Sequence, residues 1–224
     1  MKQRVAELKE LAVEVAAHPD KQLSTVDPDA RLLKTQAMNR QLCYNVQSSV
    51  DTKHHLIVTH EVTNTNDRGK LADLTRLTQQ ALAQKNITVL ADKGYYSGRD
   101  IKETQDMGAS ALVPKGDTSG AKKKGIFNRA LFKYDKDRDL YVCPAGNELP
   151  HKRDVEERGM KLKIYVDHIA CRDCDIRAKC TQSKREPRKI RRWVHEGEME
   201  EMLTRLKNAP DTVLIRKQTV EHPF

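Results

Sequence analysis

In the central third of the chain, two β-rich runs are followed by leucines at helical spacing and then by two short apolar runs. This succession constrains the fold more than any other feature of the sequence. Residues 42–50 and 56–63 are β-rich runs around a short polar turn, which predicts an antiparallel hairpin. Leucines then recur at helical spacing over residues 71–85. Short apolar runs at 87–91 and 110–113 are typical of buried strands. The sequence therefore predicts an α/β fold.

Asp92 is the carboxylate whose position is most informative. It follows the first short apolar run and precedes a glycine turn, where α/β sheets place ligands. Position alone leaves two interpretations open, a functional carboxylate and a turn residue. We interpret Asp51, Asp67 and Asp100 as turn and cap residues, and Ser97 with Asp100 as a capping box.

Composition and the N-terminal pattern exclude several classes of protein. The 224 residues contain no run of about 18 apolar residues, so no transmembrane helix is expected. Residues 5–17 form a charged amphipathic pattern without the apolar core of a signal peptide. We therefore expect a soluble cytoplasmic protein with no membrane partner.

Positive charge is concentrated in the second half of the chain. The first 112 residues carry 15 Lys and Arg against 14 Asp and Glu, whereas the remainder carries 26 against 18. This excess indicates a polyanionic partner, with nucleic acid first, and a solubilising surface is the alternative. The densest basic run consists of Lys184, Arg185, Arg188, Lys189, Arg191 and Arg192.

Four of the five cysteines lie in one stretch, and Cys43 stands apart. The four are Cys143, Cys171, Cys174 and Cys180. Without an export signal, disulfides are not expected, and a structural zinc site with four thiolates is the better interpretation. The five-residue gap before Cys180 is longer than usual for zinc ligands, so buried reduced thiols remain the alternative.

Five motifs in order resemble bacterial insertion-sequence transposases of the DDE type. They are Y-N-V-Q-S-S-V-D at 44–51, H-H-L-I-V-T-H-E-V-T-N at 54–64, A-D-K-G-Y-Y-S at 91–97, Y-V-C-P-A-G at 141–146 and R-K-Q-T-V-E-H-P-F at 216–224. Each motif is weak alone, but five in the family's order are specific.

The resemblance implies a ribonuclease-H-like core in which two aspartates and a glutamate hold two Mg²⁺ ions. Asp92 matches the second aspartate and Glu221 the glutamate. Hard divalent cations require such oxygen ligands for phosphoryl transfer. Arg216 and Lys217 would contact DNA phosphates, and Lys93 with Tyr95 would flank the site. The implied reaction is Mg²⁺-dependent DNA strand cleavage and transfer.

The first catalytic aspartate of the family has no counterpart here. Relatives carry it in a D-G-(S/T) motif upstream of the Y-N-V-Q run, and this sequence lacks that motif. We expect Asp27, Asp29 and Asp51 not to replace it. The chain is therefore expected to be an internal fragment, inactive in strand transfer. Alternatives are a non-catalytic DNA-binding or inhibitory partner of a full-length transposase, or the inert product of a decayed element. The expected partners are DNA and either a full-length transposase or further copies of this chain.

These features together predict the arrangement of the chain. We expect an incomplete ribonuclease-H-like α/β core, with the central strand missing, a small cysteine-rich β insertion and C-terminal helices. The expected segments are an N-terminal helix and linker at 1–40, the partial core at 41–116, the cysteine-rich basic insertion at 117–193, and C-terminal helices at 194–224 that return to the core.

Overall fold

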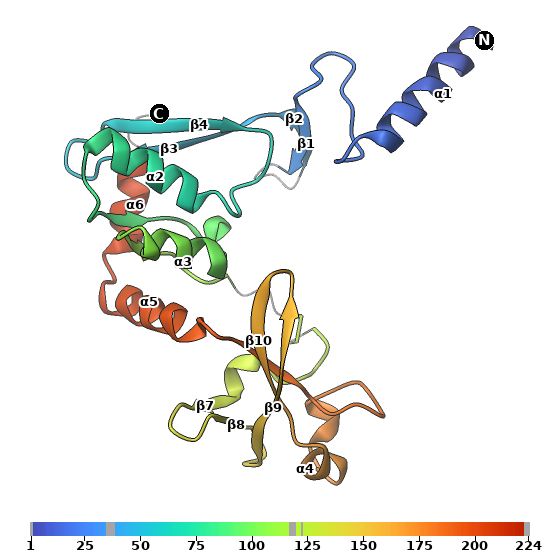
Figure 1. Ribbon diagram of the computed structural model, residues 1–224, viewed down its shortest axis with the longest axis vertical. Coiled ribbons are helices and arrows are strands. Elements are labelled where there is room, and N and C mark those ends of the chain that lie inside the picture. Colours follow the sequence, from blue (N-terminus) through green and yellow to red (C-terminus); the bar gives the residue numbers. More distant parts are fainter. Residues whose placement is uncertain (1, 35–38, 117–119, 122, 222–224) are drawn as a thin grey trace. The chain divides into compact units, whose positions relative to one another are not determined.

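The computed structural model describes residues 2–34, 39–116, 120–121 and 123–221, and Figure 1 traces the chain through them. Residues 1–115 and 202–224 form one compact unit, unit 1, and residues 116–201 form the other, unit 2. Both contain helices and strands, so the mixed α/β composition predicted from the sequence is confirmed. None of the described helices has the length and apolar content needed to span a membrane.

Unit 1 combines helices with three two-stranded sheets among the described residues. The helices are α1 (Lys2–Ala17), α2 (Leu71–Leu82), α3 (Gly98–Asp106), α6 (Thr212–Glu221) and the end of α5 (Glu196–Asn208). The strands are β1 (Arg31–Lys34), β2 (Arg40–Cys43), β3 (Asn45–Val50), β4 (Ile57–Thr63), β5 (Thr88–Leu90) and β6 (Ser110–Leu112). The sheets pair β1 with β2, β3 with β4, and β5 with β6.

β3 and β4 form the predicted antiparallel hairpin, with Asn45 opposite Thr63. The prediction was wrong at its start, because Leu42 and Cys43 lie in β2, which pairs with β1. Tyr44 separates the two strands, and its hydroxyl donates a hydrogen bond to the Asp27 carboxylate at 2.9 Å. This bond fixes the chain between the hairpin and the preceding segment.

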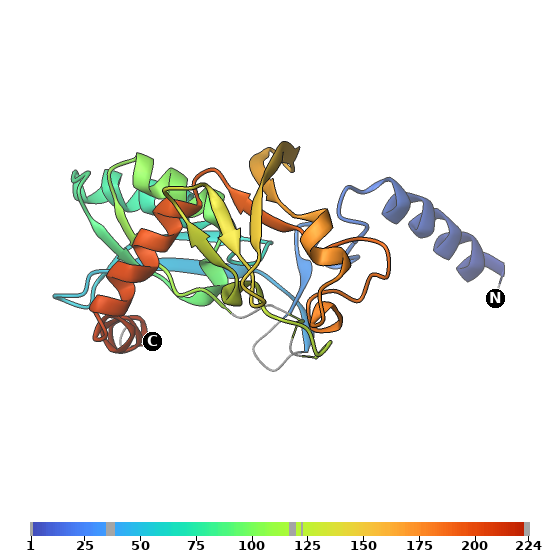
Figure 2. The ribbon, with the colours of Figure 1, turned by 90° about the horizontal axis from the view of Figure 1, so that it is seen from below.

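β5 and β6 are parallel, and α3 connects them. α3 packs beside α2 (Figures 1 and 2). Leu71 and Leu74 of α2 and Ile101 of α3 are buried. Leu77 and Leu82, which helical spacing places on the same apolar face, are exposed. Burial of the first three side chains holds the two helices together and fixes the end of β5, where Asp92 lies.

The capping box predicted at Ser97 and Asp100 is absent. Ser97 precedes α3 but its side chain makes no capping hydrogen bond. The Asp100 carboxylate instead accepts hydrogen bonds from the backbone N–H groups of Leu71 at 2.9 Å and Ala72 at 3.0 Å, at the start of α2. A buried carboxylate thus satisfies the free N–H groups of a neighbouring helix, and α2 and α3 are joined by it.

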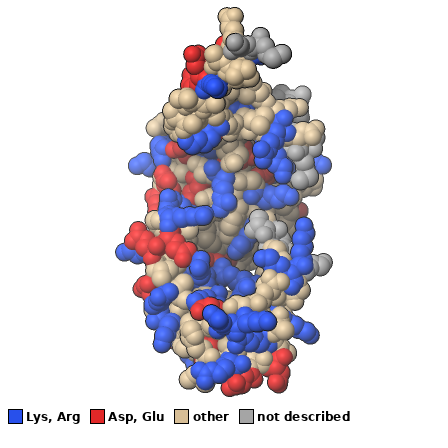
Figure 3. Space-filling view, turned by 90° about the vertical axis from the view of Figure 1, so that its right-hand side faces the viewer, with Lys and Arg blue, Asp and Glu red and all other residues tan. Residues whose placement is uncertain are grey.

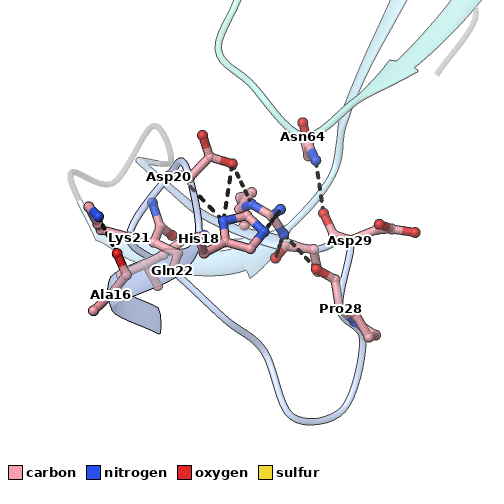
Figure 4. Close-up of polar contacts among 11 residues, drawn as sticks. Ala16, His18, Asp20, Lys21, Gln22, Pro28, Asp29 and Asn64 are labelled. Atoms are coloured by element: carbon pink, nitrogen blue, oxygen red, sulfur yellow. Dashed lines mark hydrogen bonds and ion pairs between the residues drawn. The ribbon is translucent and has the colours of Figure 1, made fainter. Parts of the chain in front are cut away.

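A guanidinium holds the segment between α1 and β1. Arg31 is only 9% exposed, and its Nε donates to Asp20 at 3.0 Å while Nη1 donates to the Pro28 carbonyl at 2.7 Å. Asn64, which precedes α2, donates to the Asp29 carbonyl at 3.0 Å (Figure 4). The stretch predicted as a linker is therefore ordered by polar contacts.

Unit 2 is built on an antiparallel sheet in the order β11-β10-β9-β8-β7. Its strands are β7 (Lys133–Asp135), β8 (Leu140–Val142), β9 (Glu148–Glu157), β10 (Met160–Tyr165) and β11 (Ile190–Trp193), and α4 (His168–Arg172) follows β10. Its core consists of Phe132, Tyr141, Leu149, Tyr165 and Ile190.

Residues 132–142 contain two short strands, β7 and β8, joined by a turn. Asp135 Oδ1 accepts hydrogen bonds from the backbone N–H groups of Asp137 and Arg138, both at 3.1 Å. Asp139 then adopts a left-handed conformation, with φ of 47°, which reverses the chain. The hydrogen bonds of this aspartate-rich turn therefore end one strand and begin the next, so that β7 and β8 do not form a single strand.

Candidate functional site

Asp92 lies where the sequence places it, directly after β5. It begins a short 3₁₀ turn, η1 (Lys93–Tyr95), and Oδ1 of Asp92 accepts a hydrogen bond from the Gly94 N–H at 2.6 Å. This bond holds the half-buried carboxylate against the turn that follows the strand. The side chain is thus fixed by backbone structure at the carboxyl end of a parallel pair.

A second carboxylate, that of Asp67, faces Asp92 across Gly94. A Cβ built on Gly94 would lie 2.9 Å from Oδ1 of Asp92 and 3.0 Å from Oδ2 of Asp67. Since both oxygens lie so close to one point, they are less than 6 Å apart. Oδ1 of Asp67 accepts hydrogen bonds from the side-chain amides of Asn45 at 2.8 Å and Gln47 at 3.4 Å.

Asp67 lies in a turn, as expected, since its carbonyl accepts a hydrogen bond from the Lys70 N–H at 3.2 Å, but it does not cap α2. α2 starts after Lys70, whose side chain makes no capping hydrogen bond. The site residue that sequence reasoning missed is therefore Asp67. In the sequence it is one aspartate in a polar turn, and only the folded hairpin brings Asn45 and Gln47 to it.

Tyr95 lies near enough to both carboxylates to be affected by their charges. Burial, followed by the negative charges of Asp67 and Asp92, raises the pKa of the Tyr95 hydroxyl, and Arg216 opposes this shift. The hydroxyl is therefore a proton donor, not a phenolate, at neutral pH. Its place agrees with the expectation that Tyr95 flanks the site.

Asp92 also lines a cavity of about 240 Å³. Three cationic side chains line it as well, those of Lys93, Lys115 and Arg216. Arg216 comes from α6, which contacts β5, so the C-terminal helix of unit 1 brings a guanidinium to the cavity of Asp92. Lys217, its neighbour in α6, is exposed.

Glu221 is the last residue of α6, and its side chain lies outside what the structure describes. The carboxylates offered as replacements for the first aspartate serve local structure. Asp27 binds the Tyr44 hydroxyl, and Asp51 accepts a hydrogen bond from the His54 N–H at 2.8 Å. That backbone hydrogen bond is the main cause that lowers the pKa of Asp51.

The basic run of unit 2 divides into exposed and occupied side chains. Lys184 and Arg185 are exposed, whereas Lys189 pairs with Glu186 at 2.5 Å and Arg191 with Glu157 at 3.0 Å. Figure 3 shows Lys and Arg side chains over much of the face drawn, interspersed with acidic ones. The exposed members of the run are free to meet an anionic partner.

Arg192, one of the residues expected to contact DNA, is buried and paired within unit 2. It is 7% exposed, and its guanidinium binds both carboxylate oxygens of Glu200 at 2.6 and 2.7 Å. Arg188 is half-buried with its guanidinium over the Phe132 ring. Alternation along β11 explains the difference, because Arg191 points to solvent and Arg192 into the unit.

The four clustered cysteines line one small apolar cavity of about 20 Å³ in unit 2. They are Cys143, Cys171, Cys174 and Cys180, and all are free thiols. Burial raises the pKa of Cys180 to about 11; Arg188 opposes the shift and the other three cysteines add to it. Across the described residues, no three His, Cys, Asp or Glu side chains are arranged to hold a metal ion.

Comparison with known proteins identifies the family. Residues 20–201 match the transposase DDE domain. Since the match covers most of the 224 residues, the chain belongs to the DDE transposase family, as the motifs indicated. No curated protein and no solved structure matches the chain. Members of this family carry out DNA transposition and generally depend on Mg²⁺.

Proposed function

We propose that this chain is a DNA-binding part of a DDE transposase, and that Asp92 marks its site for Mg²⁺-dependent phosphodiester chemistry. One observation carries the proposal: Asp92 lines a cavity with Lys93, Lys115 and Arg216. A carboxylate beside several cations suits a phosphodiester, because the cations contact the phosphate while the carboxylate holds a metal ion.

The residues around Asp92 fit a hard divalent cation. Carboxylate and amide oxygens are the ligands that Mg²⁺ prefers, and a buried amide oxygen of Gln47 has no hydrogen-bond partner among the described residues. Asp92 would hold the ion, and Glu221 is the further ligand that the resemblance implies. A bound Mg²⁺ would activate the attacking oxygen and stabilise the leaving one.

The remaining residues of the site have separate roles. The Gly94 N–H orients the Asp92 carboxylate, and the Arg216 and Lys115 side chains meet substrate phosphate oxygens. The Tyr95 hydroxyl, kept protonated by its surroundings, would serve as a hydrogen-bond donor to DNA at the edge of the site. These groups position DNA, and none of them replaces a metal-binding carboxylate.

We further propose that unit 2 is an insertion into an incomplete ribonuclease-H-like core. Two features support this: the β3–β4 hairpin and the β5–β6 pair are separate sheets, and unit 2 comes between β6 and α6 in the chain. Exposed cations of unit 2, Lys184 and Arg185 first, would add phosphate contacts.

A structural zinc ion in unit 2 is part of the same proposal. The four cysteines come from three segments and line one apolar cavity, which supports the proposal. Since no three of them form a metal site as the described residues stand, a bound zinc would have to draw the thiolates together. Elemental analysis of the purified protein tests it. We expect about one zinc per chain, lost on Cys174→Ser, whereas Cys43→Ser, outside the cluster, retains it. Protein free of zinc after expression in zinc-supplied medium would favour buried thiols.

Catalysis by these residues alone is not expected. Two-metal chemistry needs a bridging carboxylate, and the family's D-G-(S/T) motif is not among these residues. We would measure binding to labelled duplex DNA over a range of salt, and nicking of supercoiled DNA with Mg²⁺ or Mn²⁺. The expected result is salt-dependent binding without nicking.

Matched variants separate the parts of the proposal. Arg216→Ala should weaken DNA binding and reduce the salt slope by about 1, whereas Arg205→Ala, exposed on α5, should change neither. Metal-dependent nicking that disappears in Asp92→Ala would overturn the expected inactivity. Absence of any salt-dependent binding would overturn the DNA-binding role and leave the interpretation as a decayed product.

A further inference from the structure

We propose that Asp67 and the amide oxygen of Gln47 join Asp92 in holding one divalent cation. This inference rests on the proposed metal-dependent function and adds ligands to it. The family resemblance assigns no role to Asp67, and its place in the sequence predicts a turn or cap residue. The assignment comes from the contacts around Gly94 in the folded chain.

The carboxylates of Asp67 and Asp92 lie close together. Oδ1 of Asp92 and Oδ2 of Asp67 are less than 6 Å apart, since each is within 3.0 Å of the point where a Cβ on Gly94 would lie. Two negative charges so close repel each other unless a cation lies between or beside them. Glycine at position 94 leaves room for both oxygens.

A further feature of the site is the side-chain amide of Gln47. Gln47 is 2% exposed, and its Nε2 donates to Asp67 Oδ1 at 3.4 Å, so its amide group lies beside the Asp67 carboxylate. Its Oε1 is buried and has no hydrogen-bond partner among the described residues. Buried polar atoms without partners are uncommon, and such an oxygen indicates a missing ligand such as a cation or an ordered water.

Asp67 is held in place by two side chains of β3. Asn45 and Gln47 are two residues apart on β3, so both side chains project from the same face of the strand. Their hydrogen bonds both fall on Oδ1, which leaves Oδ2 as the atom that faces Asp92. An oxygen positioned by its neighbours loses little freedom when it binds an ion.

The donor set selects the kind of cation. Two carboxylate oxygens and one amide oxygen are hard ligands, and Mg²⁺ is commonly bound by one or two carboxylates together with water. Among the described residues the proposed site has only two acidic side chains, because the side chain of Glu221 lies outside them. It is therefore compatible with the finding that no three His, Cys, Asp or Glu among the described residues form a metal site.

The experiment measures Mn²⁺ binding to the full chain by electron paramagnetic resonance, without DNA. Asp67→Asn keeps the oxygen that accepts from Asn45 but removes the charge. We expect Asp67→Asn and Asp92→Asn each to weaken Mn²⁺ binding at least about tenfold. The matched control is Asp106→Asn, on the exposed surface of α3, which should bind as the parent does.

Each outcome decides one part of the inference. Binding lost in Asp92→Asn but retained in Asp67→Asn would overturn the role of Asp67 and leave the proposed function standing. Retention in both variants, or no Mn²⁺ binding by the parent at millimolar concentration, would overturn both. If circular dichroism shows Asp67→Asn unfolded, Gln47→Met provides the test: unchanged affinity in that variant would overturn the three-ligand site.

Discussion

Arg192, buried in unit 2, forms a two-point ion pair with the exposed carboxylate of Glu200. Nη1 and Nη2 of the guanidinium donate to the two carboxylate oxygens at 2.6 and 2.7 Å, and the guanidinium also stacks over the Tyr134 ring, 3.8 Å from its centroid. Paired planar contacts of this kind are geometrically specific to arginine. The pair links β11 to α5, so the most buried cation of the basic run serves the fold.

Replacing Arg192 should therefore affect stability and not DNA binding. Arg192→Lys loses the paired geometry and the stacking, and we expect unfolding in urea to require about 1–2 kcal/mol less free energy. Arg185→Ala should leave unfolding unchanged and lower the salt slope of DNA binding by about 1. If Arg192→Lys weakened DNA binding as Arg185→Ala does, the assignment of Arg192 to the interior would be wrong.

Asp139 should make unit 2 sensitive to acid. Its carboxylate accepts hydrogen bonds from Lys163 at 2.8 Å and from the hydroxyls of Tyr134 and Tyr165, both at 2.6 Å. The bond from Lys163, then those from the tyrosines, lower the pKa of Asp139 below its ordinary value of 3.8. Because the folded-state pKa is lower, this stabilisation is complete above about pH 4 and is lost as the pH falls below that value.

Asp139→Asn tests this contribution. The side chain is 36% exposed, so screening by solvent limits the expected loss at pH 7 to about 1 kcal/mol. The difference between parent and variant should shrink as the pH falls from 5 to 2, measured by urea unfolding. Asp137→Asn, exposed in the same turn, is the control and should unfold like the parent at every pH. A difference that stayed constant with pH would exclude the ionised carboxylate as its source.

The sequence predicts that Ser97 and Asp100 together cap α3. In the structure Asp100 instead accepts hydrogen bonds from the start of α2, and Ser97 makes no capping bond. Asp100→Ala removes both hydrogen bonds at the start of α2 and should destabilise the chain by about 1–2 kcal/mol. Ser97→Ala removes a side chain without a capping bond and should cost little. Hydrogen exchange would locate the effect in α2. Equal losses in the two variants, confined to α3, would restore the capping box.

The sequence predicts elements well where apolar spacing is decisive. The hairpin, the helix α2 and the strand β5, which precedes Asp92, all depend on local periodicity, which one window of sequence contains. β9 shows the limit of this reasoning. Its sequence, ELPHKRDVEE, is mostly charged and exposed, so no apolar alternation identifies it, and only pairing with β8 and β10 forms the strand.

Of the two carboxylates of the candidate site, only that of Asp92 was predictable from the sequence. Asp92 follows from position in a strand and from the family motif, whereas Asp67 lies in a polar turn 25 positions earlier. Its approach to Asp92 requires the hairpin and the β5 turn to fold together, and no local pattern encodes that contact. Arg192 shows the same limit, since charge alone does not tell a buried guanidinium from an exposed one.

Gly94 should be required for cation binding although it carries no ligand. An alanine Cβ at this position would lie 2.9 Å from Asp92 Oδ1 and 3.0 Å from Asp67 Oδ2, closer than Cβ contacts allow, so the carboxylates must move apart. Carboxylate ends move at little cost, and the free energy of unfolding should change little. Mn²⁺ affinity should fall about tenfold, because ligand positions tolerate displacements of only about 0.5 Å. Gly197→Ala, where no atom lies within 4 Å of the added Cβ, controls for the substitution itself. Unchanged Mn²⁺ affinity in Gly94→Ala would place the cation away from the space between these two carboxylates.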